Sequence, residues 1–436
     1  MKVLSELNQL LWGGPVLILL MSLHLYHTFH LGFIQRRILT GIRLSIGDDT
    51  PAARHGFSRF GSLTTTLAAT LGTGNIVGVS TAVFLGGPGA VFWCWLTGVF
   101  GMATTYAETY LCCKYRYPDH HGRLQSGPMY LLSHLLGRHG LAALYAAALC
   151  ISAFFVGCTT QSNAITEACS HVFGVLSPVS AILTAFIVGL ILLQGKRWIE
   201  KFSMAVVPSM AVFFLGGCLL YLILHRAYIL PALARILSSA FGFAQIGGGL
   251  AGFTMGKAMR YGVARGLFTN EAGLGTAGLV AGNSSENKAE NQALISMSAS
   301  FWDTVVLCAI TGLVLVAFQL EYPAEWVTLP ASSLTAAAFG KLPFFGDEIL
   351  AIAIISFALA TLVGWSFFGL QGFEYLFHGH GKRVYLAVYI LMIFIGGVMP
   401  LTLVWEMTDL INIFLLVPSV YLLVRCRQLY SGTSYR

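Results

Sequence analysis

Residues 71–78 read Leu71-Gly72-Thr73-Gly74-Asn75-Ile76-Val77-Gly78 and lie inside an otherwise apolar segment. Three glycines within seven residues weaken a helix at this point, because each costs roughly 1 kcal/mol relative to alanine. Thr73 and Asn75 add polar side chains at the same level. A membrane helix that loses backbone hydrogen bonds at depth needs protein, water or a ligand to satisfy them. The stretch is therefore typical of a broken helix beside a binding site for an ion or a small polar solute.

The composition predicts a protein whose solvent is lipid. The chain is 56% hydrophobic and 10% charged, with a mean hydropathy of +0.75, whereas soluble domains carry about 25% charged residues. A transmembrane helix needs roughly 20 mostly apolar residues. We therefore expect an all-α polytopic membrane protein with 11 transmembrane helices, near 13–33, 62–85, 88–113, 141–168, 175–194, 202–224, 238–262, 293–318, 347–376, 384–404 and 408–425.

The basic residues predict an orientation. Of the 25 Lys and Arg residues, twenty-one fall on one set of alternate loops and four (Lys2, Arg226, Arg235 and Lys341) fall on the other. Because cytoplasmic loops are enriched in Lys and Arg, we expect the amino terminus outside and the carboxyl terminus in the cytoplasm. The expected location is the plasma (bacterial inner) membrane. The formal charge of +7 then follows from topology, and no basic stripe with interleaved aromatic residues indicates nucleic-acid binding.

Ten helices remain when the first is set aside, and they divide into two sets of five. The trailing set begins with segment 238–262, whose run Gly247-Gly248-Gly249 lies near mid-segment, as Gly72-Thr73-Gly74 does in the leading set. Paired breaks of this kind indicate a transporter site, and close helix packing through glycine is the alternative. The predicted parts are an amino-terminal helix with a basic cytoplasmic linker (1–55), two five-helix repeats (56–236 and 237–425) and a cytoplasmic tail (426–436).

A site of this kind suits an amino acid and a small cation. Amides at a half-helix N-terminus attract a carboxylate, while freed carbonyls suit Na⁺ or an ammonium group. Gln161 follows Gly157 by one turn, and Thr361 and Trp365 share one helix face. Gln161 can contact a ligand or bond to another helix. Trp365 can equally be a core or interfacial aromatic residue.

Two ionisable residues, Glu108 and Asp303, lie in predicted spans, where such residues are costly and usually functional or paired. Two roles remain open for them: a proton carrier, or a hydrogen-bond partner of a neighbouring helix break. Asn270-Glu271 lies in a predicted cytoplasmic stretch, 257–292. There it fits either an inner gate or a helix cap.

Four stretches, 68–79, 86–108, 261–275 and 361–365, resemble the alanine or glycine:cation symporter family. The resemblance implies a LeuT-type fold, a 5+5 inverted repeat with one extra N-terminal helix. It also implies uptake of a small neutral amino acid with Na⁺, of the alanine or glycine class, or glutamine or serine in some members. The implied substrate contacts are Thr73, Gly74, Asn75, Gln161, Ile246, Gly247, Gly248, Thr361 and Trp365, and the implied Na⁺ ligands are Ala68, Leu71, Phe357 and Thr361.

The chain departs from the family pattern at Ala360-Thr361, where many members have two adjacent hydroxyl residues, and at 367–370 and Pro418-Ser419. If Ala360 falls on a cation ligand, one oxygen is lost, which would weaken Na⁺ binding or favour H⁺ coupling. An intramembrane enzyme would need converging His, Ser or paired carboxylates at one depth. The polar residues at depth are instead amides and hydroxyls, so we expect no enzyme. A channel is the third alternative, and saturable gradient-driven uptake distinguishes a carrier from it. The sequence predicts neither the oligomeric state nor the preferred amino acid.

Overall fold

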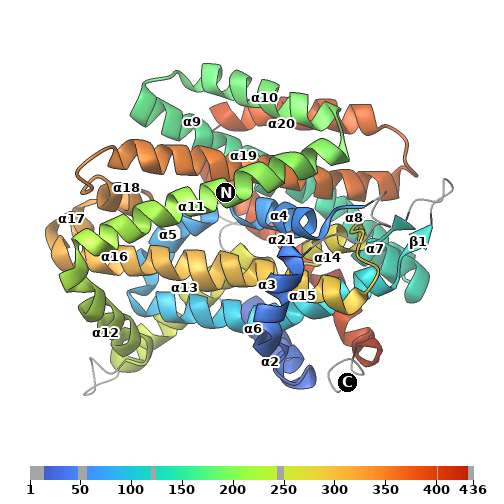
Figure 1. Ribbon diagram of the computed structural model, residues 1–436, viewed down its shortest axis with the longest axis horizontal. Helices are drawn as coiled ribbons and strands as arrows, with labels where there is room; N and C mark the ends of the chain where they lie inside the picture. The colour runs from blue at the N-terminus through green and yellow to red at the C-terminus, as the bar shows by residue number, and fades with distance from the viewer. Residues whose placement is uncertain (1–13, 48–55, 119–123, 243–249, 400, 431–436) are drawn as a thin grey trace.

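The computed structural model describes residues 14–47, 56–118, 124–242, 250–399 and 401–430. The described part is almost entirely helical, and most of its long helices run roughly along the horizontal direction of Figure 1. A single antiparallel pair of two-residue strands is found among the described residues, with Tyr117 opposite Gln125. The predicted all-α class is therefore confirmed for this part of the chain.

The helices and strands fall on either side of the undescribed segment 243–249. Before it lie α2 (Pro15–His30), η1 (Ile34–Arg37), α3 (Ile38–Ile46), α4 (Arg59–Thr70), η2 (Thr73–Asn75), α5 (Val77–Gly86), α6 (Gly89–Lys114), β1 (Tyr117–Pro118), β2 (Leu124–Gln125), α7 (Pro128–Tyr130), η3 (Leu131–Leu135), α8 (His139–Phe154), η4 (Phe155–Thr159), α9 (Thr160–Phe173), α10 (Ser177–Leu193), α11 (Lys196–Leu224), η5 (Arg226–Tyr228) and α12 (Ile229–Ala240). After it lie α13 (Leu250–Asn270), α14 (Thr276–Gly282), α15 (Ala289–Ser300), η7 (Phe301–Cys308), α16 (Ala309–Glu321), α17 (Pro323–Thr328), η8 (Ala331–Ser333), α18 (Leu334–Phe339), α19 (Gly346–Leu376), α20 (Lys382–Val398), α21 (Leu401–Arg425) and η9 (Arg427–Leu429).

Five of the described helices, each counted with the segment that continues it, are long and apolar enough to cross a membrane. Two bent pairs, one at the amino terminus and one formed by α4 with the helix that follows it, would raise that number to seven. Ser177–Leu193 and Leu410–Arg425 are shorter apolar helices. The count of eleven spans and the 5+5 repeat therefore remain predictions.

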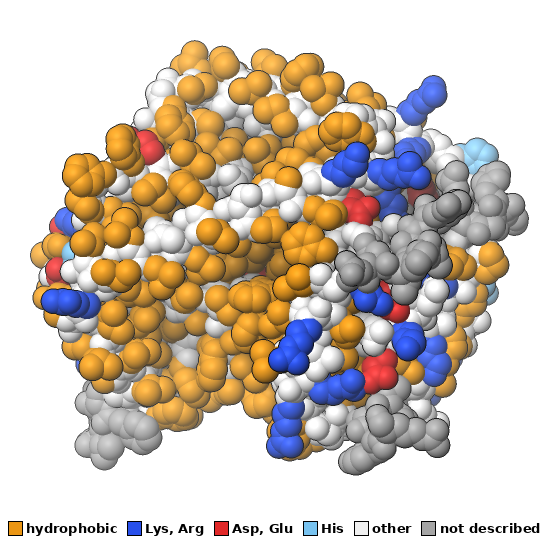
Figure 2. All heavy atoms as spheres, viewed as in Figure 1, with side chains coloured by type: hydrophobic (Ala, Val, Ile, Leu, Met, Phe, Trp, Pro, Cys, Tyr) orange, Lys and Arg blue, Asp and Glu red, His pale blue; other side chains and the backbone are white. Residues whose placement is uncertain are grey.

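The surface separates apolar and basic side chains. Hydrophobic side chains cover most of the face in Figure 2, whereas Lys and Arg gather at its right-hand end, where α3, α7 and α15 lie in Figure 1. A wide hydrophobic surface on long parallel helices is what a lipid environment requires. One end of the bundle is thus distinguished from the other by its positive charge.

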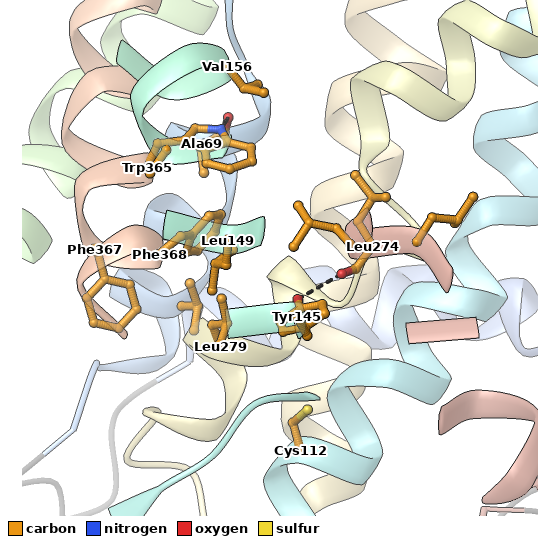
Figure 3. Packing of buried hydrophobic residues seen from close by; sticks show 14 of the residues in the cluster. Ala69, Cys112, Tyr145, Leu149, Val156, Leu274, Leu279, Trp365, Phe367 and Phe368 are labelled. Atoms are coloured by element: carbon orange, nitrogen blue, oxygen red, sulfur yellow. Dashed lines mark hydrogen bonds between the residues drawn. The ribbon is translucent and has the colours of Figure 1, made fainter. Parts of the chain in front are cut away.

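Two clusters of buried hydrophobic residues form the core. In the first, Trp365 and Phe368 of α19 lie near Leu149 of α8 and Leu279 of α14 (Figure 3). The second joins α4, α5, α11, α16 and α19. The two clusters hold α4, α8 and α19 against one another, and α19 carries Phe357, Thr361 and Trp365 of the predicted site.

Two widened, π-helical turns interrupt long helices of the core. η4 (Phe155–Thr159) lies between α8 and α9, and η7 (Phe301–Cys308) lies between α15 and α16. Such turns are rare and often occur at functional sites, because they expose backbone groups and redirect side chains. Asp303 of η7 contacts Asn75 in the first helix break. The Val156 carbonyl of η4 accepts a hydrogen bond from Gln161, which itself contacts Thr73 in that break.

Candidate binding site

The apolar segment that begins at α4 is interrupted where its glycines predict. α4 ends at Thr70 and α5 begins at Val77, with one short turn, Thr73–Asn75, between them. The chain bends by 65° there. The side-chain Oδ1 of Asn75 accepts a hydrogen bond from the Gly72 N–H at 3.1 Å, and the Asn75 N–H donates to the Gly72 carbonyl at 3.1 Å. Asn75 therefore replaces part of the helical hydrogen bonding that the glycines give up.

Gln161 contacts this break directly. Its Oε1 accepts from the N–H of Thr73 at 3.4 Å and from the Thr73 hydroxyl at 3.3 Å. Its Nε2 donates to the Val156 carbonyl in η4 at 3.4 Å. Both Gln161 and Thr73 are buried. Gln161 thus bonds to a neighbouring helix and also faces the cavity described below.

Trp365 is part of the same arrangement and is 1% exposed. Its indole N–H donates to the Ala69 carbonyl at 3.2 Å, in the last turn of α4. Gly157 provides the space for it: a Cβ at Gly157 would lie 2.0 Å from the Cβ of Trp365. The close approach of η4 to α19 therefore depends on this glycine.

Oxygen atoms of two helices converge at Thr361. Its Oγ1 lies 3.0 Å from the Leu71 carbonyl oxygen and 3.0 Å from the Phe357 carbonyl oxygen. All three residues are buried, as is Ala68, one turn before Leu71. Three of the four implied Na⁺ ligands are therefore in contact, and hard cations prefer such oxygen ligands. Ala360 is also buried but offers no side-chain oxygen.

A cavity of about 30 Å³ lies against the first break. A water molecule needs roughly 10–15 Å³ of such space, so an amino acid would fit only if lining side chains moved. The lining includes four residues of the predicted site, three residues next to predicted ones, and others outside the predicted site: Gly74, Gln161, Thr361 and Trp365; Ala69, Thr70 and Gly72; and Val156, Arg265, Phe268, Thr269, Glu271, Leu274 and Asn412.

A second interruption faces the same cavity. α13 ends at Asn270 and α14 begins at Thr276. Between them Glu271, Gly273 and Gly275 have φ values of 52°, 97° and 82°, the left-handed region that glycine tolerates best. Phe268, Thr269, Glu271 and Leu274 of this stretch line the cavity, and its predicted place in a cytoplasmic stretch, as an inner gate or a helix cap, stays a prediction. The predicted break residues Ile246, Gly247 and Gly248 lie outside the described residues.

Side chains of other helices satisfy the backbone groups of this turn. Glu108 of α6 accepts, through Oε1, the N–H of Gly273 at 2.7 Å and the N–H of Gly275 at 3.1 Å. The Tyr145 hydroxyl of α8 donates to the Leu274 carbonyl at 2.8 Å (Figure 3). The spaced glycines of Gly273-Leu274-Gly275 repeat the pattern of Gly72-Thr73-Gly74, and that repetition is the signal that could have located the break.

Asp303, in η7, binds the first break as Glu108 binds the second. Its Oδ1 accepts from the Asn75 side-chain amide at 2.5 Å, and its Oδ2 accepts from the Thr304 hydroxyl at 2.7 Å. Of the two roles left open by the sequence, these contacts support hydrogen bonding to a helix break for both carboxylic residues. Neither Asp303 nor Glu108 lines the cavity.

Arg265 lies between the two broken helices. A Cβ at Gly74 or at Gly78 would lie 2.0 Å from its guanidinium nitrogens, so these glycines leave room for the Arg265 side chain. Later in α5, a Cβ at Gly86 would lie 2.9 Å from the Cβ of Tyr261, which precedes Arg265 in α13. α5 and α13 therefore pack in opposite directions. Arg265, one of the twenty-one basic residues on the predicted cytoplasmic loops, lines the cavity.

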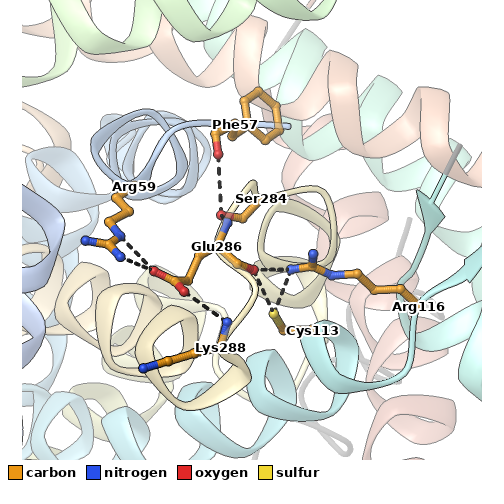
Figure 4. A network of polar contacts seen from close by, with 7 residues as sticks. All are labelled: Phe57, Arg59, Cys113, Arg116, Ser284, Glu286 and Lys288. Carbon is orange, nitrogen blue, oxygen red and sulfur yellow. Dashed lines mark hydrogen bonds and ion pairs between the residues drawn. The ribbon is translucent and has the colours of Figure 1, made fainter. Parts of the chain in front are cut away.

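The other two half-helices, α4 and α14, meet at their far ends (Figure 4). The Arg59 guanidinium pairs with the Glu286 carboxylate at 2.6 Å, with side chains only 15% and 4% exposed. The Phe57 N–H donates to the Asn283 carbonyl at 3.0 Å, and the Ser285 N–H donates to the Phe57 carbonyl at 2.8 Å. We call this contact region the clasp.

Comparison with known proteins identifies the family. The sequence model of the Sodium:alanine symporter family matches residues 1–431. The chain is 39% identical to the "Sodium/alanine symporter AgcS" of Methanococcus maripaludis, over 96% of this chain and 93% of that protein. It is 31% identical to the "Probable sodium/glutamine symporter GlnT" of Bacillus subtilis, over 92% of this chain and 83% of that protein.

Among solved structures, MhsT in complex with L-phenylalanine matches with a TM-score of 0.62 at 15% identity, over 86% of this chain and 90% of MhsT. A Na⁺-coupled sialic acid symporter in a substrate-bound outward-open state matches with a TM-score of 0.51 at 12% identity, over 90% and 82% of the two chains. These likenesses show that the fold is of the LeuT type. Broken helices around a shared cavity, in a chain of this length and fold, are those of a membrane transporter and not of an enzyme, and the chain belongs to the sodium:alanine symporter family.

Proposed function

We propose that this protein imports a small neutral amino acid of the alanine and glycine class together with Na⁺, by alternating access. The observation that carries the proposal is the convergence of the Leu71 and Phe357 carbonyls on the Thr361 hydroxyl, beside a cavity bounded by two helix breaks. The Na⁺ ion is held by these oxygens, with the Ala68 carbonyl as the fourth ligand. The names of the relatives, sodium/alanine and sodium/glutamine symporters, agree with this class of solute and ion.

The amino acid lies against the first break in this proposal. Its carboxylate faces the turn that contains Gly74, because the start of α5 and the nearby Arg265 guanidinium both favour negative charge. Gln161 and Thr361 line the same cavity.

We assign the interruptions at 71–76 and 271–275 as the equivalent breaks of the two repeats. Support comes from the spaced glycines in each, from the antiparallel packing of α5 on α13, and from the buried carboxylic side chain that holds each break. With α13 in this place, the second repeat begins near residue 250. The basic end of the bundle in Figure 2 then faces the cytoplasm, and the clasp lies at that end.

The coupling ion has one alternative. Ala360 adjoins Thr361 but contributes no side-chain oxygen, and a cation site short of one ligand binds Na⁺ more weakly. This favours H⁺ as the second candidate for the coupling ion.

The test is uptake into liposomes that contain the purified protein. With an inward Na⁺ gradient, alanine or glycine should accumulate above the external concentration, and a proton gradient alone should drive less. Gln161→Ala, which removes the contact with Thr73, should abolish accumulation while the protein remains monodisperse. Accumulation driven only by the proton gradient would assign the coupling to H⁺, and no gradient-driven uptake would refute symport.

A further inference from the structure

Asn412 lines the cavity and lies on α21, a helix that carries no residue of the predicted site. Its side chain is 3% exposed, and its Oδ1 has no hydrogen-bond partner in the described part of the chain. Gln161, the other amide in the cavity wall, has its Oε1 occupied by Thr73. The Oδ1 of Asn412 can therefore accept a hydrogen bond from a solute, whereas the Oε1 of Gln161 already accepts from Thr73.

The position of Asn412 is fixed by the contacts of the same helix face. Leu416 and Ser419 follow it at one and two turns, and both face the second break: a Cβ at Gly273 would lie 3.8 Å from Leu416 Cδ1, and a Cβ at Gly275 would lie 3.1 Å from Ser419 Oγ. Leu416 and Ser419 are themselves buried. α21 is thus packed along residues 271–275, and Asn412 reaches the cavity one turn beyond that contact.

The surroundings of Asn412 distinguish it from the carboxylate end of the proposed site. The first break, with its amides, belongs to α4 and α5, whereas α21 packs on α8, η4 and α9. Val156 of η4 and Leu274 also line the cavity and are apolar. A buried amide oxygen without a hydrogen-bond donor is unfavourable. A solute whose side chain carries a hydroxyl can donate a hydrogen bond to this oxygen, whereas a methyl group cannot.

We propose that Asn412 contacts the side chain of the transported amino acid and raises the preference for a small side chain with a hydroxyl over alanine. This inference rests on the proposed function and specifies its solute. A site built to hydrogen-bond a hydroxyl discriminates against an analogue that lacks it, because the polar group of the site is then left unpaired.

The experiment measures L-serine and L-alanine uptake in the same proteoliposome preparation, for the wild type and for Asn412→Leu, which keeps a similar volume. The ratio of kcat/KM for serine to that for alanine should fall about tenfold in Asn412→Leu. This ratio does not depend on how much protein is folded. Ser419→Ala is the matched control, because it removes a buried, unpartnered hydroxyl from the same helix face outside the cavity, and its ratio should equal that of the wild type.

The possible results separate this inference from the proposed function. An unchanged serine-to-alanine ratio in Asn412→Leu would overturn the inference while leaving symport intact. An equal loss of serine and alanine uptake is one such result, expected if Asn412 bound the solute's ammonium group or only filled space. If the wild type accumulated no amino acid under any gradient, both the proposed function and the inference would fall.

Discussion

Replacing Thr361 by valine removes one oxygen from the proposed Na⁺ site while keeping the side-chain volume. The hydroxyl lies 3.0 Å from both the Leu71 and Phe357 carbonyls and is buried, so nothing else in the immediate contact set replaces it. A hydrogen bond to a charged group contributes about 1.5–3 kcal/mol, and we take a cation ligand to be of similar strength. Because 1.4 kcal/mol is a factor of ten, the Na⁺ concentration for half-maximal uptake should rise roughly 10- to 100-fold.

The assay is alanine uptake into proteoliposomes over a Na⁺ titration at a fixed membrane potential. Thr361→Ser retains the oxygen and should stay within about threefold of the wild type, which is below the roughly tenfold minimum expected for valine. Thr66→Val is the control for a buried threonine, because its hydroxyl bonds only to the Ser62 carbonyl of the preceding turn. If Thr361→Val and Thr361→Ser gave the same Na⁺ dependence as the wild type, the ion would not bind at this oxygen cluster.

Two further changes test the packing around the site. Gly157→Ala places a Cβ 2.0 Å from the Cβ of Trp365, so η4 and α19 must separate, at a cost of about 1–3 kcal/mol. Uptake should be lost and the melting temperature in detergent lowered. The control is Gly216→Ala, which has nothing within 4 Å of its Cβ and should change neither quantity. Glu286→Gln removes the carboxylate charge that pairs with the Arg59 guanidinium in the clasp, at a cost of about 3 kcal/mol. The Cys113 thiol donates to the Glu286 carbonyl at 3.7 Å, so an opened clasp should expose this thiol and raise its rate of alkylation, measured by peptide mass spectrometry. An unchanged alkylation rate would argue that the clasp does not open.

Local features of the sequence predicted the position of the first helix break. The break at Gly72 and Gly74 follows from helix propensity over a few residues. The spacing of Thr361 and Trp365 placed them on one helix face, and in the fold both contact the end of the segment that begins with α4, while their roles towards Na⁺ and substrate stay predictions. The roles of Glu108 and Asp303 could only be narrowed to two, because sequence does not tell which backbone N–H or amide group lies opposite a buried carboxylic side chain.

The interruption at 271–275 was not predicted from the sequence, for a physical reason. A hydropathy window treats Arg265, Asn270 and Glu271 as residues that need water, and so it assigns their stretch to a loop. In the fold, Glu108 and Tyr145 supply the hydrogen bonds of the turn that follows, and that supply comes from helices more than a hundred residues away in the chain.

The sequence alone determined that this chain is a helical membrane protein of a symporter family, with one helix broken at a known place, because composition and backbone propensity are local properties. Only the tertiary structure decided which polar residues face the common cavity. Arg265, Glu271 and Asn412 come from three separate segments, and their meeting depends on how α13, the turn at 271–275 and α21 pack. That packing is set by the shapes of all the neighbouring helices together, which no stretch of sequence encodes by itself.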